Sequence, residues 1–556
     1  MLQQLSLDGL EDRKARGAFF TPPEIARFMV DWAVRSKGDA VLEPSCGEAA
    51  FLLPAARRLH ALGATKRAIS QQLEAGDIHQ ASVEEAQKVL AREGFGAKTD
   101  VGDFFLKSAS PSFDAVVGNP PYVRYQQFGG ASRAASLQAA LRQGVRLTQL
   151  ASSWAAFTVH ASAFLRPEGR LALVIPAELL SVKYATQIRR FLLDRFASVR
   201  LVLFETLVFP GVLEDVVLLL AEGSGGAQSF EVFQARSAAD LATKLPAQWL
   251  KFKPATDDKW TGALLSTDAY RLYDEAVGSA DIETMSAWGS TYLGAVTGNN
   301  DFFTLSEVDV ERMKLGSAEL MKISPPGARH LRGLNFSAQA WRSMVKGGER
   351  CYLFKPGSEP SKAARDYIAY GESLGVHNAY KCRVREPWWV VPVVAKPDLL
   401  MPYMNHDRPR LVRNGAGIQL LNSIYGVKLE ATRRKLGQEL LPLAMLNSLT
   451  LLGSEIVGRA YGGGMLKHEP TEAGKIPLPS HAALEAMADP LKSVQDCVNS
   501  LLERNEVEAA ASVVDDVFLR KRLGWTESRL KAIREARATL VQRRLTRGKG
   551  KNGSDR

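Results

Sequence analysis

The ten residues from Phe113 to Tyr122 read FDAVVGNPPY, and they constrain the fold more than any other stretch of the chain. The apolar run Phe113–Val117 predicts a short buried strand of a parallel sheet. Gly118 ends this strand, and two prolines stiffen the loop after it, because each proline fixes its own φ and restricts the residue before it. The alternative is a plain proline-rich turn. We expect an amide and an aromatic ring beyond the carboxyl end of a strand, where open α/β sheets bind ligands.

The loop Asn119-Pro120-Pro121-Tyr122 resembles the catalytic loop of amino-methyltransferases, which methylate an exocyclic or amide nitrogen with S-adenosylmethionine. The exocyclic nitrogen of adenine is a poor nucleophile because its lone pair is delocalised into the ring. The Asn119 side-chain oxygen and the Pro120 carbonyl would accept both amino hydrogens and draw the nitrogen toward a tetrahedral geometry. Tyr122 would stack on the base. Catalysis would then come from positioning and oriented dipoles.

A second expected strand, Ala40–Glu43, is followed by the small-residue turn PSCGEAAF, which opens into a helix. A strand, a tight turn and a helix N-terminus together make a nucleotide or cofactor site. Glu43 would hold the cationic amino group of a methionine moiety. The fingerprint GxGxxG is absent, so a dinucleotide is not expected.

Two further acidic residues between this turn and the catalytic loop are candidate cofactor ligands. Asp77 follows a poorly marked strand and would bind ribose hydroxyls, with Glu74 as a rival. Asp103 follows a third strand and suits the amino group of adenine, with Phe104 beside it. One such acid is usually a loop cap, but three in this order ahead of the catalytic loop indicate a cofactor site.

A helix is expected after Thr21, which is a suitable N-cap with Pro22 at the first helical position and Glu24 completing a capping box. Its apolar residues recur at helical spacing on one face: Ile25, Phe28, Met29 and Trp32. The segment before it would cover the cofactor. Strands at 170–175, 199–204 and 216–221 complete an α/β pattern. The sequence therefore predicts a doubly wound, mostly parallel sheet whose last two strands are antiparallel neighbours.

The composition limits the class of protein. A chain of 556 residues fits two or three domains, and no apolar stretch approaches the roughly 20 residues of a membrane span. The four cysteines form no CxxC pair and the eight histidines no HExxH motif, so we expect a cytoplasmic protein without a structural metal. A net charge of +11 favours an anionic partner, and nucleic acid is the obvious candidate.

In the order of these motifs, residues from about 15 to 225 resemble the catalytic domain of gamma-class DNA adenine-N6 methyltransferases, the TaqI-like modification enzymes. The resemblance implies a class I methyltransferase fold, S-adenosylmethionine as cofactor and double-stranded DNA as partner. It assigns the target adenine to Asn119, Pro120 and Tyr122, with Phe209 as the second aromatic that closes on the flipped base. Asn119 would also border the cofactor, together with Thr21, Glu43, Ser45, Asp77, Ile78, Asp103, Phe104 and Phe157.

Three features depart from the family pattern. Ala49 stands where many relatives have a second glycine, which questions the tightness of the cofactor turn. His79 follows Ile78 where an acidic residue is common, which weakens the ribose assignment. The interval from Glu43 to Asp77 is long and implies an inserted stretch around 59–72.

The expected organisation is a catalytic domain at 1–240, a connecting segment at 241–284 and an α+β target-recognition domain at 285–480. A helical region at 481–545 and a basic disordered tail at 546–556 would follow, and the tail arginines, with Arg544 among them, are expected in solvent. Arg459 and Lys467 are candidate DNA contacts. The cofactor motifs begin near residue 17, so a fused N-terminal nuclease is not expected, and a separately encoded restriction endonuclease would be the partner.

Other functions stay open at this point. Cytosine-N4 methylation is close in mechanism, but that family more often has serine at the position of Asn119. Asn-Pro-Pro-Tyr also occurs in enzymes that methylate RNA bases or protein glutamine. A glutamine enzyme would rarely need some 300 further residues of basic sequence. A catalytically silent DNA-binding scaffold is disfavoured, because the catalytic loop is intact.

Overall fold

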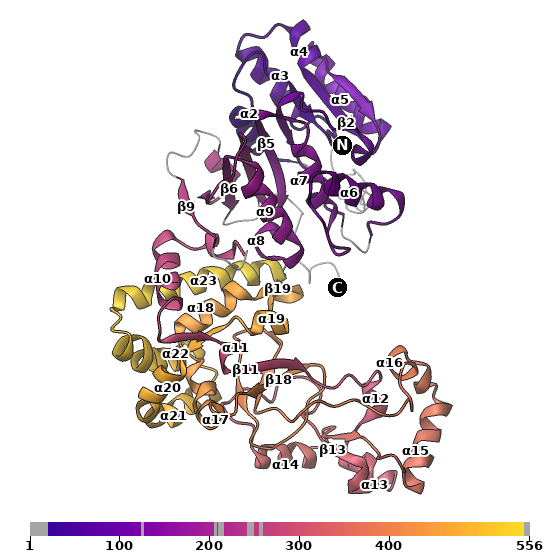
Figure 1. Ribbon diagram of the computed structural model, residues 1–556, viewed down its shortest axis with the longest axis vertical. Helices are drawn as coiled ribbons and strands as arrows, with labels where there is room; N and C mark the ends of the chain where they lie inside the picture. The colour runs from indigo at the N-terminus through magenta and orange to yellow at the C-terminus, as the bar shows by residue number, and fades with distance from the viewer. Residues whose placement is uncertain are drawn as a thin grey trace, which may run out of the picture. The chain divides into compact units, whose positions relative to one another are not determined.

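The computed structural model describes residues 21–123, 127–204, 208, 216–241, 249–254 and 259–549, without the side chains of 267, 462 and 546–549 (Figure 1). The chain forms two compact units, Met1–Thr267 and Asp268–Arg556. The finer domain limits expected from the sequence stay predictions.

A nine-stranded sheet spans the described residues of the first unit, in the order β3-β2-β1-β4-β5-β7-β6-β8-β9. Neighbouring strands from β3 to β5 are parallel, whereas β7 is antiparallel to both β5 and β6. This confirms the doubly wound, mostly parallel sheet and the antiparallel pair at 199–204 and 216–221. The strands are β1 Val41–Glu43, β2 Leu73–Asp77, β3 Lys98–Val101, β4 Phe113–Gly118, β5 Leu165–Pro176, β6 Ser198–Phe204, β7 Val216–Glu222, β8 Phe230–Ala235 and β9 Leu250–Phe252.

Helices alternate with these strands and cover the sheet (Figure 1). Two of them, α3 and α4, fill the long interval between β1 and β2, where the sequence implies an insertion. The helices are α2 Pro23–Ala33, α3 Leu52–Ala61, α4 Lys66–Gln72, α5 Gln80–Arg92, α6 Gly130–Arg142, α7 Ser153–Ser162, α8 Glu178–Ser181 and α9 Thr186–Arg195.

The first described helix, α2, buries the four apolar residues expected on its inner face, Ile25, Phe28, Met29 and Trp32. The expected capping box is wrong, however. The N-cap is Pro22, Pro23 occupies the first turn, and no side chain caps the helix. The physical reason is that the Thr21 hydroxyl is bonded to the catalytic loop instead: it accepts a hydrogen bond from Asn119 Nδ2.

The second unit is built from small sheets and helices, as an α+β region should be. Its sheets have the orders β11-β18-β15-β17, β12-β14-β13, β16-β20-β19 and β10-β21. The strands are β10 Ile282–Thr284, β11 Gly289–Leu293, β12 Thr304–Leu305, β13 Leu320–Lys322, β14 Tyr352–Phe354, β15 Leu399–Pro402, β16 Met404–Asn405, β17 Val412–Arg413, β18 Ile424–Leu429, β19 Arg459–Tyr461, β20 Met465–Lys467 and β21 Pro477–Pro479.

Helices dominate this unit from residue 434 onward, and those after residue 480 confirm the expected terminal helices. They include α17 Arg434–Ala444, α18 Ser448–Val457, α21 Ala488–Glu503, α22 Val507–Asp515 and α23 Glu527–Lys549, and α23 packs against α18. In the part of the chain that the structure describes, no single helix is long and apolar enough to cross a membrane. Only α17 and α18 together meet that test of length and composition, and they bend by 90°.

One expectation about the C-terminus is wrong, because Arg544 does not lie in solvent. Helix α23 continues to Lys549, residues 550–556 lie outside the described residues, and the expected tail at 546–556 stays a prediction. Arg544, expected in solvent, is 3% exposed and lies 2.8 Å from Glu455 Oε1. A buried guanidinium needs such a partner, because an unpaired charge in the interior is costly.

Candidate active site

The catalytic loop leaves the carboxyl end of β4 and fixes the Asn119 amide from two sides. Asn119 Nδ2 donates to Thr21 Oγ1 over 3.2 Å, and the Tyr122 hydroxyl donates to Asn119 Oδ1 over 2.7 Å. The same hydroxyl lies 2.9 Å from the Val174 carbonyl on β5. Strands β4 and β5 are neighbours in the sheet, so β5 helps to set the position of the amide.

Ser153, the first residue of α7, fastens the second half of this loop. Its hydroxyl donates to the Pro121 carbonyl and accepts from the Val123 amide over 2.9 Å, and its own amide donates to the Val123 carbonyl over 3.0 Å. The sequence analysis did not single out this residue. The signal was present as a serine at a helix N-terminus.

Two groups of the loop matter for a bound base. The Pro120 carbonyl accepts no hydrogen bond from the residues that the structure describes, so both of its lone pairs are available. The side chain of Tyr122 is 7% exposed and its hydroxyl is bonded within the protein. Base stacking by Tyr122 therefore stays a prediction. Phe209, the expected second aromatic, lies outside the described residues.

Glu43 ends β1 and is buried. It is 1% exposed, and its Oε1 accepts a long hydrogen bond of 3.4 Å from the Phe51 amide. Its Oε2 is buried and has no hydrogen-bond partner among the described residues. Burial raises the pKa of this carboxyl well above its ordinary value, because the charged form is desolvated. A cationic ligand would satisfy the open oxygen, so the residues present fit the ammonium group of a methionine moiety.

The turn after Glu43 joins the cofactor site to the catalytic loop. The Ser45 hydroxyl donates to the Asn119 carbonyl over 3.3 Å, and the Gly47 amide donates to Asp77 Oδ2 over 3.0 Å. Ala49 has a φ of 65°. The turn is therefore tight at the residue where many relatives have glycine, and alanine takes the left-handed conformation there at a cost of roughly 1 kcal/mol.

Asp77 lies at the end of β2, as the ribose assignment requires. Its Oδ1 accepts a hydrogen bond of 2.9 Å from the His79 amide, so the backbone of His79 orients the carboxylate whatever its side chain. Ile78 is 58% exposed beside it. The rival Glu74 is engaged elsewhere, because Lys107 Nζ lies 3.0 Å from its Oε1.

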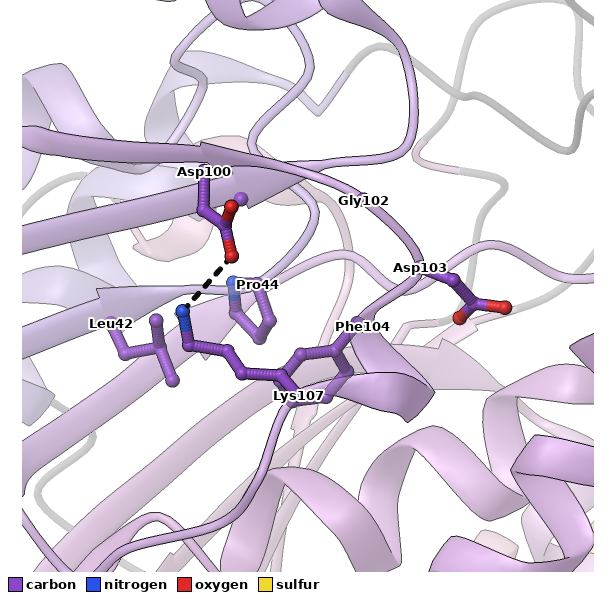
Figure 2. A pocket seen from close by; sticks show the side chains of 8 residues that line it. Leu42, Pro44, Asp100, Gly102, Asp103, Phe104 and Lys107 are labelled. Atoms are coloured by element: carbon purple, nitrogen blue, oxygen red, sulfur yellow. Dashed lines mark hydrogen bonds and ion pairs between the residues drawn. The ribbon is translucent and has the colours of Figure 1, made fainter.

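Asp103 and Phe104 form the third part of the candidate cofactor site. Asp103 Oδ1 caps the following turn by accepting from the Phe105 amide over 3.0 Å. The centroid of the Phe104 ring lies 4.8 Å from that of Phe157 and 4.6 Å from that of His160, so Phe157 packs against Phe104 and supports it. Figure 2 shows that the Asp103 carboxylate points away from the Lys107–Asp100 pair. It also shows the hollow beside these residues, lined by Leu42, Pro44, Gly76, Asp100, Gly102, Asp103, Phe104 and Lys107.

The two residues expected to contact DNA lie in the second unit, and both have internal partners. Arg459 Nε lies 3.1 Å from both carboxylate oxygens of Glu472. Lys467 Nζ lies 2.8 Å from Glu469 Oε1. Their contact with DNA stays a prediction.

Known families match both parts of the chain. The N-6 DNA Methylase family matches residues 7–223, and the family described as the C-terminal domain of Type II methyltransferase M.Eco57I matches residues 257–519. The first of these matches covers both loops of the candidate site. Its catalytic sheet, with an antiparallel strand between β5 and β6, is the class I methyltransferase fold, and the adenine-methylase resemblance stated from the motifs is confirmed.

Two similar proteins align with most of the chain. Type II methyltransferase M.AccI of Acinetobacter calcoaceticus is 22% identical over 84% of this chain and 86% of its own length. Type II methyltransferase M.XamI of Xanthomonas campestris pv. amaranthicola is 24% identical over 86% of this chain and 88% of its own length. The solved Type IIL restriction-modification enzyme MmeI shares the fold, with a TM-score of 0.55 and 12% identity over 94% of this chain and 75% of that one.

Proposed function

We propose that this methylase transfers a methyl group from S-adenosylmethionine to N6 of an adenine in double-stranded DNA. One observation carries the proposal: the unpartnered Glu43 carboxylate oxygen and the Asn119 amide are parts of two loops that Ser45 ties together. A site for a cationic amino acid thus adjoins an amide suited to an amino nitrogen. The match to the N-6 DNA Methylase family over 7–223 covers both loops.

The methylase's own residues would hold the cofactor in three places. Glu43 would bind the ammonium group, Asp77 the ribose hydroxyls, and Asp103 the amino group of the adenine ring, with Phe104 against that ring. When bound, S-adenosylmethionine supplies an electrophilic methyl group on a sulfonium sulfur. Thr21, Ser45, Ile78 and Phe157 would complete the surroundings of the cofactor.

The catalytic loop would activate the target nitrogen by accepting its hydrogens. Asn119 Oδ1 receives one hydrogen bond from Tyr122 and keeps a lone pair for the amino group, and the Pro120 carbonyl supplies the second acceptor. Thr21 fixes the orientation of the amide through Nδ2. The adenine cannot reach this loop while it is stacked in the duplex, so it would flip, with Tyr122 and Phe209 stacking on it.

The test uses the full chain, DNA from a strain without adenine methylation, and S-adenosylmethionine with an isotopically labelled methyl group. Mass spectrometry of the digested nucleosides should give labelled N6-methyladenine. Labelled N4-methylcytosine would redirect the proposal to cytosine, and label only in RNA or in protein glutamine would overturn it. The matched control is Asn119→Ala, which removes the Oδ1 acceptor and should leave little label in the DNA.

Double-stranded DNA would be the partner, read mainly by the second unit. A separately encoded restriction endonuclease would cleave the unmethylated site. A DNA substrate also agrees with the expected cytoplasmic location.

A further inference from the structure

Residues 459–467 form a hairpin with three glycines at its tip, which we name the glycine hairpin. Strands β19 and β20 pair antiparallel, with Tyr461 opposite Met465 as the last pair before the tip Gly462–Gly464. Gly463 and Gly464 both have a φ of 73°, a conformation that favours glycine. Strand β16 pairs with β20 on its other side, so the hairpin is the edge of a three-stranded sheet.

The two cationic side chains of the hairpin form ion pairs within the protein. Arg459 is bonded to both oxygens of Glu472, and this carboxylate is itself buried. The Lys467 ammonium pairs with Glu469 and lies 5.2 Å from the Tyr461 ring and 5.8 Å from the Tyr403 ring. Both cations therefore stiffen the hairpin, and Lys467 also holds Tyr461 by a cation–π contact.

The tip is fixed from the other side by helix α23. Arg544, buried and paired with Glu455, donates to the Gly464 carbonyl. A Cβ on Gly464 would lie 3.3 Å from the Leu545 backbone, so hairpin and helix are in close contact. The last turns of this helix have a basic sequence, with arginines at 543, 544 and 547.

An aromatic side chain remains exposed on this rigid support. Tyr461 is 54% exposed, and Gly463, two residues further along the chain, has open space where a side chain would be. A single exposed tyrosine is ordinary. Here, however, an aromatic face is held in place by an internal cation beside a tip without side chains. Such a surface suits a partner with flat rings whose backbone must come close.

We propose that Tyr461 contacts the target DNA and stacks on a base exposed when the duplex is distorted, while the glycine tip lets the sugar-phosphate backbone approach. This inference rests on the proposed function as a DNA methylase. It assigns Arg459 and Lys467 to the support of the hairpin and the DNA contact to the residue between them. Stacking on an aromatic side chain tolerates any base, so Tyr461 strengthens binding at the site without choosing its sequence.

The experiment first identifies the target from the positions methylated in DNA of cells that make the chain. Binding of the full chain to that duplex is then measured by fluorescence anisotropy at fixed salt. Tyr461→Ala should weaken binding about 10-fold. Tyr461→Phe keeps the ring and should bind within about 2-fold of the wild type. Tyr370→Ala is the control, because Tyr370 is a similarly exposed tyrosine, on helix α15 Lys362–Ser373 of the same unit.

Tyr461→Leu keeps apolar bulk without an aromatic face and should bind as weakly as Tyr461→Ala, which guards against misfolding of one variant. Thermal midpoints of all variants are compared with that of the wild type. If Tyr461→Ala binds like the wild type, or Tyr461→Phe binds as weakly as Tyr461→Ala, stacking by Tyr461 is refuted. If the wild-type chain itself methylates no DNA, the proposed function fails first, which is a different result.

Discussion

The catalytic loop and the glycine hairpin are both short, rigid and rich in residues with special backbone preferences, but they gain their rigidity differently. Two prolines and neutral hydrogen bonds hold the catalytic loop, through Thr21, Tyr122 and Ser153. Ion pairs and a cation–π contact hold the hairpin. The first arrangement leaves oriented acceptors open, which suits chemistry. In the second arrangement the cations pair with acidic residues of the same protein and the Tyr461 ring stays exposed, which suits contact with another molecule.

The largest expected effect is that of Asn119→Ala, which tests whether the acceptors of the catalytic loop serve chemistry. Loss of the oriented amide should lower the methylation rate by at least about 100-fold, since a preorganised polar group is worth that much in a transition state. Rapid-mixing kinetics with one turnover per enzyme would measure it, and binding of DNA and cofactor should survive better. A variant with full activity would show that the loop is only structural.

Glu43→Gln separates cofactor binding from stability. Glutamine keeps the shape but loses the charge, so affinity for S-adenosylmethionine should fall by about 10-fold or more, as expected for a hydrogen bond to a charged group. In the wild type, bound ammonium should lower the raised pKa of Glu43 and release a proton. Titration calorimetry in buffers of different ionisation enthalpy detects this release, and the variant should show none from this residue.

The same variant should lose cofactor affinity but, at pH 8, should not lose thermal stability. The pKa of Glu43 is raised by burial, so its contribution to folding is present below the ordinary glutamate pKa and is lost as pH rises through the folded pKa. Glutamine does not titrate. Without cofactor, the variant should therefore match or exceed the wild type in thermal midpoint at pH 8 and lose this advantage toward pH 4. A variant that is less stable than the wild type at pH 8 contradicts this account.

Ser153→Ala tests whether the neutral hydrogen bonds position the catalytic loop. The substitution leaves the Val123 amide and the Pro121 carbonyl without their side-chain partner, which should lower kcat about 10-fold with little change in the KM for cofactor. Ser162→Ala is the matched control, because Ser162 is buried on the same helix and its hydroxyl bonds only within α7. Equal loss in both variants would indicate damage to the helix alone.

The sequence predicted the catalytic half well because local physics determines it. An apolar run, a glycine and two prolines specify β4 and its loop with no help from distant residues. The partners of that loop were not predicted, since Thr21, Ser153 and Val174 reach it only when β4, β5 and α7 come together. Thr21 shows the limit clearly: its local pattern fits a helix cap, and a residue 98 positions away uses its hydroxyl instead.

In the second unit the charges were visible but their partners were not. Arg459 and Lys467 are residues of the type that contact DNA phosphates. Within the fold, however, Glu472 and Glu469 neutralise their charges. Net charge reports the class of partner and does not identify the contacting residue. Arg544 shows the same limit, because it reads as part of a basic tail and is buried against Glu455.

Lys467→Ala sharpens the comparison at the hairpin. Because its ammonium pairs with Glu469, we expect DNA binding to weaken only about 2-fold. The slope of log affinity against log salt concentration should change by less than about one unit. Affinities at four salt concentrations give that slope. A slope lower by about one unit would restore Lys467 as a phosphate contact.

The smallest expected effects concern backbone conformation. The turn after Glu43 has an alanine, and the tip of the glycine hairpin a glycine, in the same left-handed conformation. Ala49 has a φ of 65° and Gly463 a φ of 73°. Glycine at 49 relieves the left-handed strain but adds freedom to the unfolded chain, so Ala49→Gly should stabilise the first unit by about 0.5 kcal/mol. Gly463→Ala should destabilise the second unit by about 1 kcal/mol, and this cost is conformational because the added Cβ meets nothing within 4 Å.

Differential scanning calorimetry of the full chain would measure both changes as shifts of about 1–4 °C in opposite directions. DNA affinity is the second readout, because Gly463→Ala also places a methyl group on the tip that is proposed to approach the DNA backbone. Affinity should fall for Gly463→Ala and stay unchanged for Ala49→Gly. If Gly463→Ala lowers stability but leaves affinity intact, the glycines serve the turn alone, and the hairpin approaches DNA through Tyr461 without its tip.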